Sequence, residues 1–167
     1  MGSAIVSWVI EIFGQGIGKI IGVFFISMLP VIELRGAIPV AYALGLNWQT
    51  AMIVAIIGNM FPIPFILLFL DFVFKFMKEH NILKNLVVKL ENKAVASSDK
   101  VTKYKFWGLA IFVGIPLPGT GGWTGALIAS VMKMRRKAAL LSIFIGVVVA
   151  AILVTMATYG VFGSIVG

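Results

Sequence analysis

The sequence predicts an all-α integral membrane protein made of two inverted repeats. Three observations support this: the composition, a charged and proline-interrupted segment inside an apolar stretch, and a second stretch with the same layout. The 167 residues are 60% hydrophobic and 12% charged, and the mean hydropathy of +1.08 lies outside the range of soluble domains. Because a spanning helix needs about 20 apolar residues, the chain has room for a few membrane elements in a single domain, 1–167.

The first element is expected over residues 4–19, where polar side chains recur four residues apart on one helical face. Ser7, Glu11, Gln15 and Lys19 form that face, and this spacing is typical of an amphipathic helix. Such a helix would lie at the membrane interface. The alternative is an ordinary spanning helix that tolerates Glu11.

The next apolar stretch, 20–46, is long enough to cross the membrane once but is interrupted at its centre. Pro30, Gly36 and Pro39 lie there, and proline breaks a continuous helix because it lacks an N–H and clashes with the preceding turn. We therefore expect two short half-helices joined by a turn.

The first spanning helix is expected over 48–74. Pro62 and Pro64 should kink it and free backbone carbonyls, and Asn59 precedes them as a possible lining of a cavity. A kink that simply packs against other helices explains the same residues equally well.

Residues 80–96 predict a basic amphipathic helix. Its apolar side chains share one stripe, and its lysines lie elsewhere. We therefore expect this helix on the cytoplasmic surface, in contact with anionic lipid headgroups.

The stretch 106–132 repeats the layout of 20–46. At an offset of 86 residues both copies carry glycine or proline at three positions, which pair Gly22 with Gly108, Pro30 with Pro116, and Gly36 with Gly122. An apolar run over 138–162 follows, as 48–74 follows the first copy.

The sequence therefore predicts repeat 1 over about 1–78 and repeat 2 over about 79–167. Each repeat would consist of an amphipathic helix, a re-entrant broken hairpin and a transmembrane helix.

Positive charge indicates that the broken segments turn back rather than cross. Residues 75–105 hold eight lysines against three acidic residues, and KMRRK at 133–137 forms a second cluster. If 106–132 crossed, the clusters would lie on opposite sides, against the positive-inside tendency. Re-entrant hairpins keep both clusters cytoplasmic, and the single remaining crossing per repeat inverts the second repeat relative to the first.

Glu33 and Arg35 are the strongest candidates for chemistry, because ionised side chains at membrane depth are costly unless they are paired or wetted. Arg35 offers a planar fork for phosphate or carboxylate, and a partly desolvated Glu33 could exchange protons. The alternative is an internal salt bridge that braces the hairpin.

The turn of the second hairpin, 116–125, has no charge but many amides. Flanking half-helices would present N–H groups that suit an oxyanion; the alternative is a tight turn whose glycines allow close helix packing. No grouping of residues predicts a metal site or a cofactor. The candidate substrate and proton site comprises Pro30, Glu33, Arg35, Gly36, Pro39, Pro116, Pro118, Gly119, Thr120, Gly121, Gly122, Trp123 and Thr124, with Asn59 as possible cavity lining.

Two motifs carry a family resemblance: ELRGAIP at 33–39 and PLPGTGGWTGALIAS at 116–130. Over essentially the whole chain, the sequence resembles the putative small multidrug export protein family, a group related to the DedA or SNARE-associated membrane superfamily. The resemblance implies paired re-entrant hairpins and, from DedA relatives, proton-dependent flipping of polyprenyl-phosphate (undecaprenyl phosphate) or phospholipid carriers. Those relatives use membrane-embedded acidic residues and arginines, and Glu33 and Arg35 are the matching types. The second hairpin lacks the arginine that DedA proteins carry by their proline motif.

The leading hypothesis is a proton-linked transporter or flippase of an amphipathic, phosphate-bearing lipid held between the two hairpin tips. Glu33 would carry the proton, and Arg35 with the 116–125 amides would contact the headgroup. The alternatives are an exporter of small cationic hydrophobic drugs, with Glu33 facing the substrate's charge, and a non-transporting membrane scaffold. An enzyme is not expected, because no set of nucleophile, base and orienting residue is visible.

We expect a multi-pass protein of the prokaryotic cytoplasmic (inner) membrane. Its expected partners are membrane lipids, with anionic headgroups at the basic amphipathic helix; no nucleic acid is expected, and a homo-oligomer is possible.

Overall fold

The computed structural model describes residues 2–13, 16–79, 99–117 and 119–161, and the regular structure in these ranges is helical. The expected all-α class is confirmed for them. The basic amphipathic helix predicted over 80–96 lies outside the described residues. The helices are α1 (Gly2–Phe13), α2 (Ile17–Met28), α3 (Glu33–Ala43), α4 (Trp48–Met60), α5 (Ile63–Glu79), α7 (Asp99–Gly114), α8 (Gly122–Val131) and α9 (Arg136–Thr155), and the π-helical turn η1 (Met156–Val161) continues α9.

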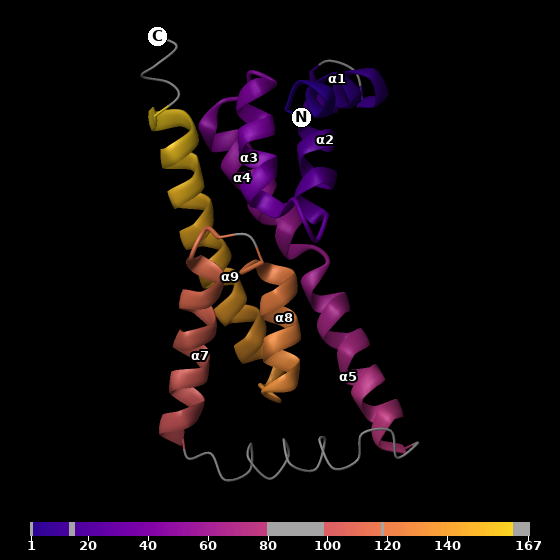
Figure 1. Ribbon diagram of the computed structural model, residues 1–167, viewed down its shortest axis with the longest axis vertical. Coiled ribbons are helices and arrows are strands. Elements are labelled where there is room, and N and C mark those ends of the chain that lie inside the picture. The colour runs from indigo at the N-terminus through magenta and orange to yellow at the C-terminus, as the bar shows by residue number, and fades with distance from the viewer. Residues whose placement is uncertain (1, 14–15, 80–98, 118, 162–167) are drawn as a thin grey trace.

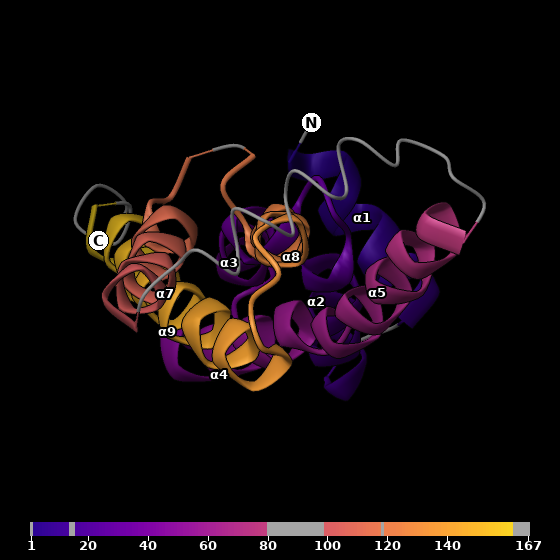
Figure 2. The same cartoon turned by 90° about the horizontal axis from the view of Figure 1, so that it is seen from below.

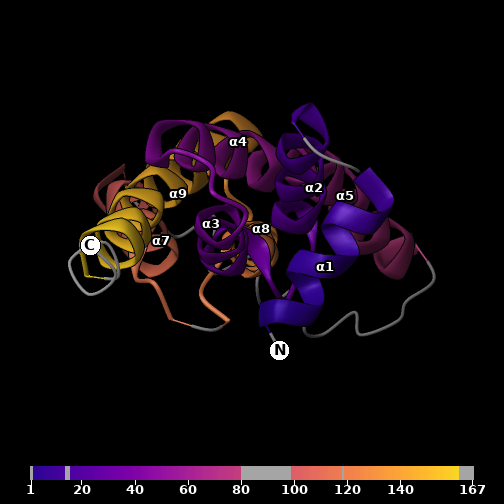
Figure 3. The ribbon, with the colours of Figure 1, turned by 90° about the horizontal axis from the view of Figure 1, so that it is seen from above.

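Two pairs of short helices meet near the middle of the molecule. Figure 1 shows α2 and α3 in the upper half and α7 and α8 in the lower half, with the turn of each pair directed toward the centre. The longer paths, α4 with α5 and α9 with η1, extend through both halves. Seen from below and from above, α3 and α8 lie near the centre, with α7 and α9 on one side and α2 and α5 on the other (Figures 2 and 3).

The first helix, α1, lies across the end of α2 (Figure 1). Its twelve residues extend about 18 Å, which is too short for the hydrocarbon core of a membrane, so the alternative of a spanning helix is wrong. The predicted single helix over 4–19 is also wrong in extent. Gly16, with φ 68, separates α1 from α2 and places Lys19 in α2.

The stretch 20–46 is divided between α2 and α3, and Pro30 lies in the turn that separates them. Gly36 and Pro39, which we expected at the break, instead lie inside α3. Pro39 is exposed, so its ring needs no room in the helix packing. Its missing N–H removes only the helical bond to the Arg35 carbonyl.

Among the described residues, two helical stretches are long and apolar enough to cross a membrane, Trp48–Leu70 and Arg136–Gly160. The first is interrupted between α4 and α5, where Pro62 has no N–H to continue the hydrogen-bond ladder. The kink is therefore confirmed at Pro62. Pro64 does not add to it, because it lies in the first turn of α5, where a missing N–H leaves no helical bond unmade.

Each half of the chain has a helix crossing at which a glycine lies against a backbone carbonyl of the neighbouring helix. Gly58 of α4 lies against α2, and a Cβ there would stand 2.5 Å from the Phe24 carbonyl oxygen. Gly146 of α9 lies against α7, and a Cβ there would stand 2.7 Å from the Ala110 carbonyl oxygen. The two glycines are 88 residues apart, and the two carbonyls are 86 residues apart.

The ends of α3 and α8 are also alike. Gly45 after α3 and Lys133 after α8 have positive φ values, 73 and 50. The next N–H groups, of Leu46 and Met134, each donate to a carbonyl five residues earlier. This is the Schellman closure of a helix, and the equivalent residues are again 88 apart.

The second limb of each hairpin therefore aligns at an offset of 88, not 86. Gly36 corresponds to Thr124, and its predicted pairing with Gly122 is wrong. The reason is the turn: more residues separate α7 from α8 than separate α2 from α3, which shifts every later residue of the second half.

Adding a methyl group at either helix crossing should loosen that helix pair. We expect Gly58→Ala and Gly146→Ala each to lower the free energy of unfolding by about 1–3 kcal/mol, because the new Cβ would overlap the neighbouring helix. Thermal unfolding in detergent measures this loss. Gly108→Ala is the matched control, since nothing lies within 4 Å of a Cβ there and alanine favours a helix. Equal stability of all three variants would contradict the prediction.

Candidate functional site

The candidate site lies where the start of α3 meets the turn between α7 and α8. Glu33 and Arg35 form an ion pair, with Arg35 Nη1 2.6 Å from Glu33 Oε2. Glu33 is 5% exposed, and the Arg35 side chain is 15% exposed. Charges so well shielded from solvent interact strongly, and removing one of them leaves the other buried and unpaired.

Glu33 caps the amino end of α8. Its Oε1 accepts a hydrogen bond from the Trp123 N–H at 3.3 Å. Trp123 is the second residue of α8, and an N–H at that position has no partner inside the helix. The carboxylate also lies at the positive end of the α8 dipole. Glu33 thus supplies the cap that Gly121, which precedes α8 and has no side chain, cannot provide.

Arg35 caps the carboxyl end of α7. Its Nη2 donates to the carbonyl oxygens of Val113 at 2.9 Å and Ile115 at 3.1 Å, and to Thr120 Oγ1 at 3.3 Å. The last carbonyls of a helix lack donors inside the helix, and a cation is favourable at this negative end. One ion pair from α3 therefore caps both half-helices of the opposite hairpin.

Two consecutive glycines allow this close approach. A Cβ on Gly121 would overlap the Glu33 carboxylate, and a Cβ on Gly122 would stand 2.7 Å from Asn59 Oδ1. Any larger residue at either position would push α8 away from α3 or α4. Gly121 is therefore required by the contact between the hairpins, and Gly122 by the contact between α8 and α4.

Glu33 has an unusual backbone conformation, with φ 49. A residue with a Cβ is strained in this left-handed region. Such strain persists where the surroundings over-determine the conformation. For Glu33 the surroundings are Arg35, the Trp123 N–H and the Cα of Gly121.

Trp123 joins the ion pair to an apolar groove. Its indole N–H donates to the Met28 carbonyl at 3.0 Å, which fastens α8 to the end of α2. The groove beside it, called the Trp123 groove below, has a volume of about 370 Å³. It is lined by Met28, Phe61, Pro62, Phe65, Ile66, Phe69 and Trp123.

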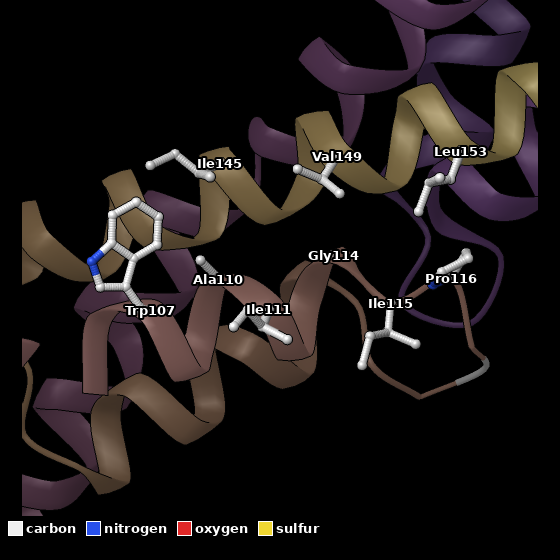
Figure 4. Close-up of a pocket in the computed structure, with 9 residues that line it drawn as sticks. All are labelled: Trp107, Ala110, Ile111, Gly114, Ile115, Pro116, Ile145, Val149 and Leu153. Atoms are coloured by element: carbon white, nitrogen blue, oxygen red, sulfur yellow. The ribbon is translucent and has the colours of Figure 1, made fainter. Parts of the chain in front are cut away.

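A second apolar groove ends at the Arg35 contact. Figure 4 shows it between α7 and α9, with Ile115 and Pro116 at one end. Its volume is about 310 Å³, and Ile115 is the residue whose carbonyl accepts from Arg35. Two apolar grooves therefore flank the ion pair. One includes Trp123, which bonds Glu33, and the other includes Ile115, which bonds Arg35. The lining residues are Trp107, Ala110, Ile111, Gly114, Ile115, Pro116, Ile145, Val149 and Leu153.

The structure brings together only part of the predicted site. Five of its residues are in direct contact: Glu33, Arg35, Thr120, Gly121 and Trp123. Gly122 contacts Asn59, and Pro116 lines the groove between α7 and α9. Pro118 lies outside the described residues. Within the described part of the chain, no hydrogen bond joins the two tips through Pro30, Gly36, Pro39, Gly119 or Thr124.

We expected the amides of the second turn to bind an oxyanion. The Trp123 N–H does donate to a carboxylate, but this carboxylate is Glu33 of the same chain. Sequence reasoning missed Met28, Val113 and Ile115, which contribute backbone carbonyls. A carbonyl has no signature in the residue type, and only a position at a helix end hints at it. Among the described residues, no three His, Asp or Glu side chains gather as a metal site would require.

Comparison with known proteins supports the export family. Residues 33–153, which begin at Glu33 and include the second turn, match the family model described as putative small multi-drug export protein. No curated protein and no solved structure matches the chain. The match covers most of the sequence, and two helical stretches are apolar and long enough to cross a membrane. The chain therefore belongs to the putative small multi-drug export protein family.

Proposed function

We propose that the chain exports small hydrophobic cations across the membrane, with Glu33 binding a proton and the substrate's charge in turn. The family description supports export by a membrane transporter. One observation carries the proposal: a buried carboxylate is held by Arg35 and the Trp123 N–H at the junction of the two hairpins.

Protonation of Glu33 would weaken both of these interactions. A neutral carboxyl loses its attraction to the guanidinium and its favourable interaction with the α8 dipole. The carboxyl would then release the Trp123 N–H, and the hairpin tips could separate. A proton and a cationic substrate compete for the same carboxylate. Their exchange at Glu33 would couple a proton gradient to export.

The Trp123 groove suits a hydrophobic cation. Three of its residues are phenylalanines, and Trp123 adds a fourth aromatic ring. Aromatic faces attract cations, and a groove of about 370 Å³ is in the size range of small-molecule sites. Trp123 belongs to both the groove and the ion-pair cluster. A substrate seated there would lie close to the Glu33 contact.

The contacts give less support to a phosphate-bearing lipid. Both Nη atoms of Arg35 donate to acceptors of the protein itself, and the Trp123 N–H binds Glu33. A phosphate would have to displace a carboxylate of the same chain from its cation. Flipping of such a lipid, and the DedA relationship that suggested it, stay hypotheses.

We also propose that the two hairpins enter the membrane from opposite faces, as parts of an inverted repeat in a prokaryotic inner membrane. The support is the duplicated helix crossing at Gly58 and Gly146 and the duplicated closure after α3 and α8. With α4–α5 and α9 as the crossings, the ion pair would lie near the membrane midplane, where secondary transporters hold their substrates.

Reconstituted protein should move a lipophilic cationic dye when a proton gradient is imposed on vesicles. We expect Phe65→Ala to lower transport at limiting dye by about tenfold, because it removes one aromatic wall of the Trp123 groove. Dye fluorescence during transport measures this. Phe65 is 62% exposed, so its loss should leave the fold intact.

Phe72→Ala is the matched control, because Phe72 is on the same helix, is 66% exposed and does not line the groove. A neutral analogue of the dye and a fluorescent phospholipid distinguish the substrate classes. Movement of the phospholipid without movement of the dye would overturn the proposal in favour of a flippase.

A further inference from the structure

Asn59 is a buried polar residue whose side chain lacks hydrogen-bond partners among the described residues. It is 0% exposed, and both Oδ1 and Nδ2 are unpaired. A buried carboxamide without partners destabilises the state that contains it. Its presence therefore calls for an explanation beyond packing.

The fold does not require a polar side chain at this place. Asn59 follows Gly58 at the crossing with α2. The residue 88 positions later is Val147, which follows Gly146 at the equivalent crossing with α7 and is also 0% exposed. Because valine fills the equivalent position, an apolar residue at 59 would serve the packing equally well.

The Asn59 carboxamide lies at the start of α8. Its Oδ1 is 2.7 Å from the point where a Cβ would stand on Gly122, and a Cβ on Gly121 would overlap the Glu33 carboxylate. Two oxygen acceptors, one charged and one neutral, therefore flank the first turn of α8. The Trp123 N–H is bound to the charged one.

We propose that Asn59 is the second acceptor for the amino end of α8, used when Glu33 is protonated or engaged by a substrate cation. In the arrangement described above, Glu33 caps α8 and Asn59 is unpaired. After release, a small shift of α8 would bring an N–H of its first turn to Asn59 Oδ1. Asn59 is then a positioning residue, because it gives the amino end of α8 a new cap when Glu33 releases the Trp123 N–H.

This inference rests on the proposed function, because release of Glu33 is a step of the transport cycle. The groups that contact Glu33 show which interactions its protonation would change. Among the described residues, Arg35 is the charged side chain that contacts it, and α8 contributes the Trp123 N–H. The second turn adds the Cα of Gly121, and Asn59 of α4 is neutral. Protonation of Glu33 alone is therefore sufficient to release the Trp123 N–H.

A protein with Trp123 as its sole tryptophan tests the release directly. Trp8, Trp48 and Trp107 are each about half exposed and can be changed to phenylalanine. Trp123 emission is then followed during acid titration in lipid nanodiscs, since its indole N–H bonds the Met28 carbonyl. We expect an emission change as acid protonates Glu33.

In this background, Asn59→Val should move the midpoint of the acid transition lower by about half a pH unit or more, because the released arrangement loses its acceptor. The same variant should raise Tm, because it removes an unpaired buried polar group. Asn59→Leu, which branches at Cγ as asparagine does, is the second variant in case valine leaves a gap.

Thr155→Val is the matched control. Thr155 Oγ1 is also buried without a partner among the described residues, and the residue lies at the end of α9. Valine there should raise Tm without moving the midpoint.

The outcomes separate the possibilities. A higher Tm with an unchanged midpoint would make Asn59 merely an unpaired group and overturn the inference. A lower Tm would overturn it too, because Asn59 would then stabilise the closed arrangement. If the sole-tryptophan protein shows no acid transition, Glu33 does not release Trp123 on protonation, and the inference is overturned. The titration needs no substrate, so failed dye transport with a normal transition would count against the proposed function alone.

Discussion

Gly121→Ala should detach the second hairpin from the first, with a loss of about 3 kcal/mol or more of unfolding free energy. Residue 121 has φ −81 and ψ −169, which alanine adopts readily, so the backbone is not the obstacle. The obstacle is the Glu33 carboxylate, which the new Cβ would overlap. Moving the carboxylate aside would break its contacts with Arg35 and the Trp123 N–H. Thermal unfolding in detergent measures the loss, and dye transport should fall with it.

The same substitution in a Glu33→Ala protein isolates the overlap. With the carboxylate gone, the added methyl group has room, and the further loss should be below about 1 kcal/mol. Gly119→Ala is a second comparison, because Gly119 has φ 85 but free space around its Cα. It should cost only the backbone strain of about 1 kcal/mol. An equal loss from Gly121→Ala in both backgrounds would show that the carboxylate is not the cause.

Local effects of the sequence predicted the all-α class, the break at Pro30 and the kink at Pro62. A proline removes an N–H wherever it occurs, and a run of about 20 apolar residues can span a membrane in any protein. These features depend on neighbours in the chain, so the sequence alone reveals them. Pro39 shows the limit, because a helix can contain an exposed proline once tertiary contacts hold it.

The register of the repeat and the partners of the ion pair were beyond sequence reasoning. Glu33 and Arg35 are close enough in the chain to suggest a pair. That Arg35 reaches Val113 and Ile115 depends on how the second turn docks against α3, and those acceptors are backbone atoms. Gly121 carried no usable signal either, because glycine is itself common before a helix and does not show that another residue supplies the cap.

The two interpretations left open by the sequence, a transport site and an internal brace, do not exclude each other in this geometry. The Glu33 carboxylate holds the two hairpins together through Arg35 and the Trp123 N–H. Because a carboxylate can take up a proton, protonation would weaken the same contacts. Stability and transport of variants at Glu33 should consequently change together, and only variants that separate charge from shape can distinguish the two contributions.

Removing both charges of the pair should cost about as much stability as removing only one of them. Arg35→Met leaves the Glu33 carboxylate buried with only the Trp123 N–H, and Glu33→Gln leaves the guanidinium without its carboxylate. Each loss should be about 3–5 kcal/mol. The double variant carries neither charge, so its loss should resemble that of one single variant, giving a coupling of about 3–5 kcal/mol. Unfolding of the four proteins in detergent measures it.

Transport of the same variants tests the role of the proton. Glu33→Gln keeps the shape and hydrogen bonding of the side chain but cannot exchange a proton, so any residual dye transport should no longer respond to pH. Glu11→Gln, on an exposed position of α1, is the matched control; its stability should stay within about 0.5 kcal/mol of the parent and its pH response should be unchanged. A stable Glu33→Gln protein with pH-dependent transport would remove Glu33 from the mechanism, and a coupling near zero would remove the ion pair from the stability of the fold.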